Sequence, residues 1–311
     1  MERIYHYTSM DALLKLLESV EKSSDKKSLV FRATNIFFLN DPQEFIYGQI
    51  VLMNVLKEIE YDQNVDDSLR ISSVFSRHHE KTEEEWSKIL LDGIHDQNES
   101  PYVISFSRNM DSLPMWLNYG DNGKGVCLAF TEYRYRILGN IINPSNLEDI
   151  KVETYDSLGT YDVNYDEGWG KDKNNILRKH IVNIYNYYLK ESKSTHHNNL
   201  LELQIGTLRA FTEVIAPYIK TKQYESEREV RLAKTLSKDK KGNVFELQFG
   251  CNSKGHLIPY IDIEIPLKQL DCVRIGPLAD KELSIKVIKM MRKKYNVSFD
   301  VEVSDIKYRN Y

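Results

Sequence analysis

The chain has 311 residues, of which 28% are charged, and its formal net charge is −4. This balance excludes a global basic field that would attract nucleic acid, but it does not exclude a local basic groove. The cysteines, Cys127, Cys251 and Cys272, are widely spaced, which excludes the common zinc and disulfide frameworks and favours a reducing compartment. The sequence shows no apolar run of membrane-spanning length and no signal peptide at its start, so we expect a cytoplasmic protein without membrane contact.

Hydrophobic periodicity and capping residues predict the elements of the first half. In chain order these are a strand at 3–7, a helix from a Thr8–Asp11 capping box to about Val20, an extended segment at 29–39, a helix from an Asp41 N-cap to about Tyr61, a helix from Thr82 to about Ile94, a strand at 102–107, helical turns at 112–120 and a strand at 126–130.

The second half is predicted in the same way. Its elements are an irregular segment with strand character at 151–165, helices at about 173–191 and 200–216, strands at about 228–234, 244–249, 257–265 and 270–275 with a hairpin loop at 238–243, a basic helix at 281–294 and a strand at 297–303. Strands at both ends with helices between them favour a single mixed α+β domain over 1–311, with 170–217 as a possible inserted helical lobe.

The stretch from Tyr224 to Leu232 is the strongest candidate for chemistry. On a strand of period two, Glu227, Glu229 and Arg231 share one face, while Val230 and Leu232 enter a core. Adjacent acids raise each other's cost of ionisation, as an acid–base or ligand-orienting pair requires. The alternative is a solvated face whose charge is balanced by the neighbouring arginines.

Other polar residues also have two interpretations. His6 on the first strand can donate to a ribose or phosphate oxygen, or serve as a satisfied core or edge residue. Capping explains Asp41 and Glu44 without any function but leaves Asn40 unexplained. Ser105 and Ser107 end a strand as turn formers or as a brace for a neighbouring carboxylate, and no nucleophile elbow surrounds them.

The twin histidines at 78–79 and 196–197 lack spaced acids or cysteines, and adjacent residues do not share a helix face. We therefore expect no metal site there. The basic helix at 281–294 is either a solvated face or a surface that touches nucleic acid.

The order of several motifs resembles a bacterial family known as domain of unknown function 2971. The matching motifs, spread from residue 5 to about 277, are Tyr5-His6-Tyr7-Thr8-Ser9, Leu39-Asn40-Asp41-Pro42-x-Glu44, Ile104-Ser105-Phe106-Ser107, Met115-Trp116-x-x-Tyr119, Gly123-x-Gly125-Val126-Cys127-Leu128, Tyr224-x-x-Glu227-x-Glu229-Val230-Arg231-Leu232 and Arg274-Ile275-Gly276-Pro277. The family label carries no activity.

A more distant resemblance is to the ADP-ribosyltransferases, in the order of His6, Ser105-x-Ser107 and Glu227-x-Glu229. It implies a mainly antiparallel sheet of ADP-ribosyltransferase-like type and an NAD-dependent mono-ADP-ribosyltransferase, a toxin or anti-phage effector that modifies a protein or nucleic-acid acceptor. The implied catalytic residues are Glu229, on the nicotinamide ribose, and Glu227, which positions the acceptor. The implied NAD-binding residues are His6, Tyr7, Thr8, Asn40, Ser105, Ser107 and Tyr119.

Two further hypotheses stay open. Asp41, Glu44, Glu227 and Glu229 can be interpreted as oxygen ligands of Mg²⁺ in a metal-dependent nuclease or hydrolase. In a non-enzymatic defence or sensor module, the same acids are structural and the inserted helices bind a partner.

Overall fold

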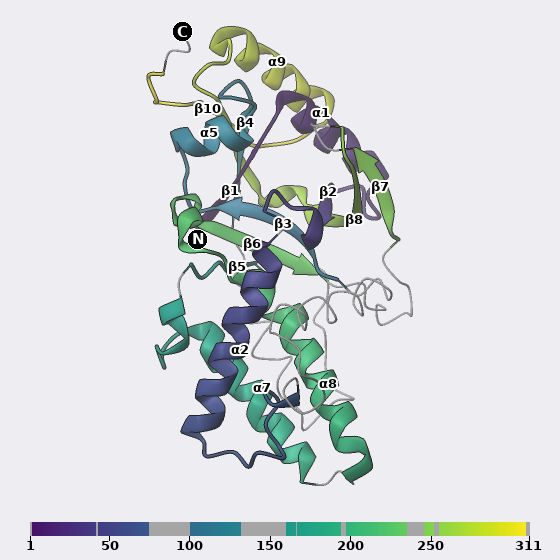
Figure 1. Cartoon of the computed structure of the whole chain (residues 1–311). Coiled ribbons are helices and arrows are strands. Elements are labelled where there is room, and N and C mark those ends of the chain that lie inside the picture. Colours follow the sequence, from purple (N-terminus) through teal and green to yellow (C-terminus); the bar gives the residue numbers. More distant parts are fainter. Residues whose placement is uncertain are drawn as a thin grey trace.

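A computed structural model describes residues 2–41, 43–74, 100–131, 160–165, 167–193, 197–234, 246–251 and 255–308. Within them the chain is α+β with a mixed, mainly antiparallel sheet, as predicted (Figure 1). The strands are β1 (Arg3–Thr8), β2 (Ser28–Asn35), β3 (Tyr102–Ser107), β4 (Val126–Thr131), β5 (Thr160–Asp162), β6 (Glu229–Lys234), β7 (Gln248–Cys251), β8 (Leu257–Pro266), β9 (Leu270–Ile275) and β10 (Asp300–Val303).

The sheet branches at β3. The main path runs β10-β9-β4-β1-β3-β2-β8-β7, while β6 pairs with β3 and β5 pairs with β6. Because β6 pairs along the whole of β3, it takes one edge of that strand, and β1 and β2 must share the other. β1 pairs at one end, where Tyr5 faces Ser107, and β2 pairs at the opposite end, where Thr34 faces Val103. The two strands therefore diverge from a common edge.

The first helix, α1 (Met10–Ser19), joins these diverging strands. Its N-cap is Ser9, whose Oγ accepts a hydrogen bond from Ala12 N at 3.1 Å, so the predicted Thr8–Asp11 capping box is wrong. Thr8 is the last residue of β1 instead, where its backbone pairs with Val126. The buried face of α1 places Leu13 and Leu17 on the sheet.

One hydrophobic core lies between the sheet and the helices α1 and α9 (Lys281–Lys294). Val230 and Leu232 of β6 belong to it, as predicted. Asp280 caps α9, since its Oδ1 accepts from Leu283 N at 3.0 Å. Both ends of α9 agree with the prediction.

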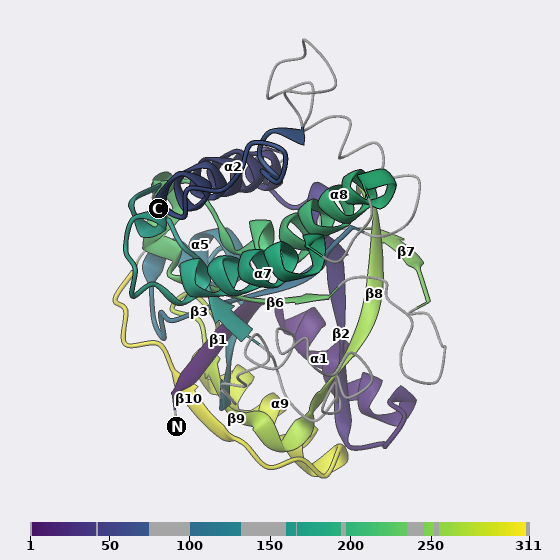
Figure 2. The same cartoon turned by 90° about the horizontal axis from the view of Figure 1, so that it is seen from below.

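A second core belongs to a lobe of three helices, α2 (Glu44–Asp62), α7 (Ile176–Ser192) and α8 (His197–Val214). They lie side by side below the sheet in Figure 1. In Figure 2, which shows the molecule from below, they lie on the viewer's side of the sheet. The lobe predicted at 170–217 contains α7 and α8, but α2 comes from a distant part of the sequence and packs against both. Gly48 allows α2 to approach the 3₁₀ turn Ala216–Tyr218 that follows α8, because a Cβ there would meet Ala216 O at 2.5 Å.

Several predicted boundaries are wrong. α2 begins at Glu44 rather than after an Asp41 N-cap, because Asp41 Oδ1 accepts locally from Gln43 N at 3.0 Å in a turn before the helix. The strand predicted at 244–249 is β7, Gln248–Cys251. β3, β4, β8, β9 and the helical turns of α5 (Leu113–Tyr119) lie where they were predicted.

The helix predicted from Thr82 to Ile94, the loop at 238–243, residues 151–159 and His78, His79 and His196 lie outside the described residues. None of the helices that the structure describes is long and apolar enough to cross a membrane.

Candidate active site

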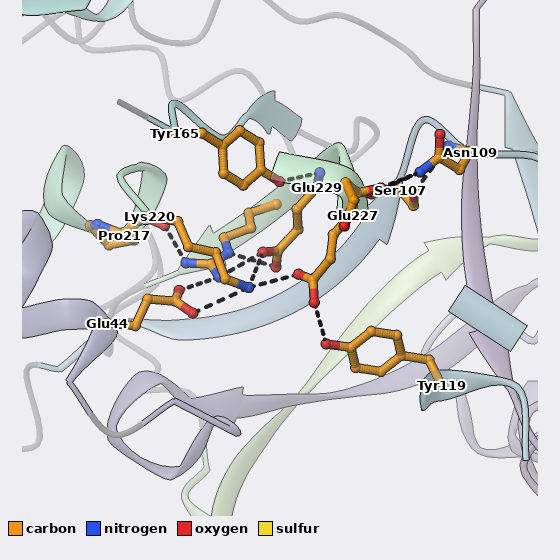
Figure 3. A network of polar contacts seen from close by, with 11 residues as sticks. Glu44, Ser107, Asn109, Tyr119, Tyr165, Pro217, Lys220, Glu227 and Glu229 are labelled. Carbon is orange, nitrogen blue, oxygen red and sulfur yellow. Dashed lines mark hydrogen bonds and ion pairs between the residues drawn. The ribbon is translucent and has the colours of Figure 1, made fainter. Parts of the chain in front are cut away.

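The ammonium group of Lys220 is the centre of a buried charge network (Figure 3). Its Nζ lies 3.3 Å from Glu44 Oε2, 2.8 Å from Glu227 Oε2 and 3.0 Å from Glu229 Oε2. Lys220 follows the turn that ends α8, Glu44 opens α2, and the other two acids flank the start of β6. The network therefore joins the helical lobe to the sheet.

Arg231 is the second cation of this network, and its side chain is only 1% exposed. Nε and Nη2 donate to the two carboxylate oxygens of Glu229 at 2.7 and 2.8 Å, and Nη1 donates to Pro217 O at 2.6 Å. Arg231 also forms an ion pair with Glu44. The face of Glu229 and Arg231 is thus buried, and the alternative of a solvated face is wrong for both residues.

The surrounding charges set the protonation states. Burial alone would raise the pKa of Glu229, but Arg231 and Lys220 outweigh it and hold that pKa at about 2. Burial alone would lower the pKa of Lys220, but the carboxylates of Glu229 and Glu44 outweigh burial and raise that pKa above its ordinary value. For Glu44 burial prevails, so its pKa is raised. Of the two acids that share Arg231, Glu44 is therefore the one whose ionisation is less favoured.

Most acceptor positions of Glu229 are occupied by the two buried cations. Its carboxylate offers about four lone-pair positions. Arg231 donates twice and Lys220 once, so three of these positions are taken by hydrogen bonds from cations. At most one acceptor position is left for a ligand, on a side chain that is only 5% exposed.

Glu227 is placed differently. It ends a 3₁₀ turn, Lys222–Glu227, and Arg228 follows it with a left-handed φ of 43°, so the strand alternation predicted for Glu227 is wrong. Tyr119 Oη donates to its Oε1 at 2.7 Å, and Lys220 holds its Oε2. Each oxygen keeps one acceptor position, and the side chain is 12% exposed.

A cleft of about 1170 Å³ opens beside these acids and follows the gap between β1 and β2. It brings together eight of the nine residues predicted for the site, which are His6, Tyr7, Thr8, Asn40, Ser105, Tyr119, Glu227 and Glu229. Ser107, the ninth, is fully buried and does not line the cleft. Its Oγ donates to Glu227 O at 2.6 Å, so it braces the backbone that carries the acid.

His6 is a hydrogen-bond acceptor toward the cleft rather than the predicted donor. Its Nδ1 lies 2.9 Å from the carbonyl oxygen of Ser105 and must therefore carry the proton. The ring packs edge-on against Phe31 and Phe106. Burial lowers the pKa of His6, which favours the neutral ring and leaves Nε2 with a free lone pair.

Tyr7 and Tyr119 differ in what they leave available. Tyr7 Oη donates to Asn109 O at 2.8 Å and accepts from Ser112 N, and its ring packs edge-on against Trp116. Tyr7 is thus 6% exposed and serves mainly as packing. Tyr119 is only half-buried and stands next to Glu227, where its ring can contact a ligand.

The hypothesis of a Mg²⁺ site meets a specific obstacle in this geometry. Glu44, Glu227 and Glu229 do converge, but the Lys220 ammonium occupies the position between them. Asp41 is engaged with its own backbone. The described residues contain no group of three acids, histidines or cysteines arranged for a metal ion.

Lys220 was missed by the sequence interpretation. It lies in a short irregular segment with no periodicity or motif, so no local signal identifies it. Glu44 was interpreted as a capping residue or metal ligand, and its ion pairs with Lys220 and Arg231 replace the capping interpretation.

Comparison with known proteins gives one match. No curated protein and no solved structure matches the chain. Residues 115–232, which include Tyr119, Lys220, Glu227, Glu229 and Arg231, match the model of a family described as protein of unknown function (DUF2971), and this match supports the predicted family for that part of the chain.

Proposed function

We propose that the chain is an NAD-dependent mono-ADP-ribosyltransferase whose active site is the cleft between β1 and β2. The observation that carries the proposal is the convergence of His6, Ser105 and Glu227 on that cleft from three adjoining strands or their ends. A volume of about 1170 Å³ is at the upper end of small-molecule sites and suits a ligand as large as a dinucleotide.

The reaction breaks the bond between the nicotinamide nitrogen and ribose C1′. Nicotinamide leaves with the bonding electron pair, positive charge develops on the ribose ring, and the acceptor forms a new bond to C1′ and loses a proton. A fixed carboxylate beside the ring stabilises that charge most strongly where water is scarce.

Glu227 is the carboxylate best placed for this role, rather than Glu229, to which the resemblance assigned it. Glu227 accepts one hydrogen bond on each oxygen and is 12% exposed, whereas Glu229 accepts three from Arg231 and Lys220 and is 5% exposed. Glu229 then acts as a positioning residue, because it fixes Lys220, which in turn holds Glu227.

The neighbouring residues have matching chemistry. His6 Nε2 can accept a ribose hydroxyl, and Thr8 and Asn40 add a hydroxyl and an amide to the same cleft. Tyr119 presents an aromatic ring next to Glu227 for stacking on nicotinamide. The acceptor is a protein or a nucleic acid.

The test incubates labelled NAD and a crude lysate with the wild type, Glu227→Gln and a matched control, Glu225→Gln, whose side chain is exposed on the same turn. We expect transfer of label to fall by about 100-fold or more in Glu227→Gln, since removing one transition-state charge contact costs that much. The control should transfer at the wild-type rate. Equal transfer by all three proteins, or no transfer by the wild type to any fraction, would contradict the proposal.

One observation favours a second candidate, a non-enzymatic module with structural acids. Glu229 is buried and accepts three hydrogen bonds from Arg231 and Lys220, as in a network that only stabilises a fold. The two candidates differ at Glu227, whose replacement by Gln should leave the cellular function of a binding module intact as long as the protein folds.

A further inference from the structure

The outer face of α9 carries an apolar stripe that nothing in the described structure covers. Leu283, Val287 and Met290 are 58%, 45% and 71% exposed, although the opposite face buries Ile288 to 1%. Their spacing of four and three residues aligns them along one side of the helix. The helix lies at the rim of the molecule, at the end opposite the helical lobe (Figure 1).

This spacing is that of a coiled-coil seam. With Leu283 and Met290 at d positions, Val287 falls at a, and both g positions are lysines, Lys286 and Lys293. Both lysines are exposed. Arg292 is not part of this face, because its guanidinium lies over the Phe299 ring at 5.5 Å. The stripe is thus bordered by positive charge along one side and ends at Lys294, the next a position.

We propose that the outer face of α9 is a docking surface for an acidic amphipathic helix of a partner protein. Apolar side chains of such a helix would cover Leu283, Val287 and Met290, and glutamates at its flanking positions would pair with Lys286 and Lys293. The inference stands independently of the proposed transferase activity, since α9 contributes no residue to the cleft.

The lysines beside the stripe favour an acidic helix over a second copy of the chain, nucleic acid or a lipid surface. An antiparallel second copy of α9 would set its g-position lysines against the same lysines, and a parallel copy would offer them only Ser284 and Met291. Nucleic acid would leave the central apolar stripe without a partner, because phosphates contact only the lysines. A lipid surface is best matched by cations on both sides of an apolar face, whereas here they border one side.

The test uses the full chain and two labelled synthetic helices of about three heptads, both with leucine at a and d, one with glutamate and one with lysine at e and g. Fluorescence anisotropy should show the wild type binding the glutamate helix at least about tenfold more tightly than the lysine helix. Lys286→Glu combined with Lys293→Glu should reverse this preference. Leu283→Ser combined with Met290→Ser should abolish binding of the glutamate helix.

All of these substitutions are on an exposed face, so unchanged thermal melting checks that each variant is folded. Equal affinity for the two helices, or binding that survives the serine substitutions, would overturn the proposal. So would stripe-dependent sedimentation of the chain with phosphatidylserine vesicles when neither helix binds, which would assign α9 to a lipid surface.

Discussion

Arg231 holds Glu229 by two parallel hydrogen bonds, from Nε to Oε1 at 2.7 Å and from Nη2 to Oε2 at 2.8 Å, although the two residues stand only two positions apart on one strand. A bidentate pair of this kind is stronger than two neutral hydrogen bonds. Both side chains are buried, so neither charge can turn to water if its partner is removed.

We expect Arg231→Met to destabilise the fold by about 3–5 kcal/mol, because it leaves Glu44 and Glu229 with one buried cation between them. The free energy of unfolding in urea measures this cost. Arg228→Met is the matched control, since Arg228 is exposed on the same segment and should change stability by less than about 0.5 kcal/mol. Similar losses in the two variants would show that the buried pair adds no stability.

The buried acids give a specific acid response. The folded pKa of Glu229, about 2, lies below its ordinary value of 4.5, so Glu229 stabilises the fold above pH 4.5 and this contribution is lost as pH falls toward 2. The loss amounts to about 3 kcal/mol. Unfolding measured between pH 6 and 2 should therefore show a smaller pH dependence in Glu229→Gln than in the wild type. A variant with an unchanged acid slope would contradict the assignment.

Ionisation of Glu44 has the opposite effect on stability. Its folded pKa is raised, so its protonated form is favoured by folding and its ionisation above the ordinary value costs stability. We expect Glu44→Gln to be tolerated much better at pH 7 than Glu229→Gln, because two acids then balance Lys220 and Arg231. Urea midpoints of the two variants make the comparison. A greater loss in Glu44→Gln would show that Glu44, not Glu229, is the main counter-ion.

Arg228 holds a left-handed backbone with φ of 43° between the two acids. Glycine adopts that conformation without a Cβ penalty, so Arg228→Gly should raise the free energy of unfolding by about 0.5–1 kcal/mol. Arg228→Ala loses the same side chain but keeps the Cβ, and should bring no such gain. Equal stability of the two variants would assign any effect to the lost side chain.

Two glycines of the helical lobe should respond oppositely to alanine. In Gly48→Ala the new Cβ would meet Ala216 O at 2.5 Å and push α2 away, which costs about 1–3 kcal/mol. Gly206 on α8 has no atom within 4 Å of such a Cβ, so Gly206→Ala should stabilise by up to about 1 kcal/mol through helix propensity. Thermal melts of both variants test the close packing of α2 on the turn at 216–218.

The sequence identified the strands that carry the cleft because each has a strong local pattern, as in Arg3–Thr8 and Tyr102–Ser107. Of the nine residues that it predicted for the site, eight line the cleft. It could not identify Lys220, or show that the Glu44 side chain forms buried ion pairs instead of capping its helix. Both depend on contacts between segments far apart in the chain. For the same reason it could not distinguish Glu229, whose carboxylate is bound by two cations, from the more accessible Glu227.

The ion pair between Glu44 and Arg231 has a consequence for how the chain is built. Glu44 opens the first helix of the lobe, while Arg231 belongs to the sheet. Cutting out 170–217 would remove the two helices that pack along α2, and the Glu44 ion pair would be left to hold α2 to the sheet with little apolar support. The lobe is therefore not an exchangeable accessory to a self-sufficient sheet. The two parts supply the halves of one electrostatic contact, and the shape of the cleft depends on both.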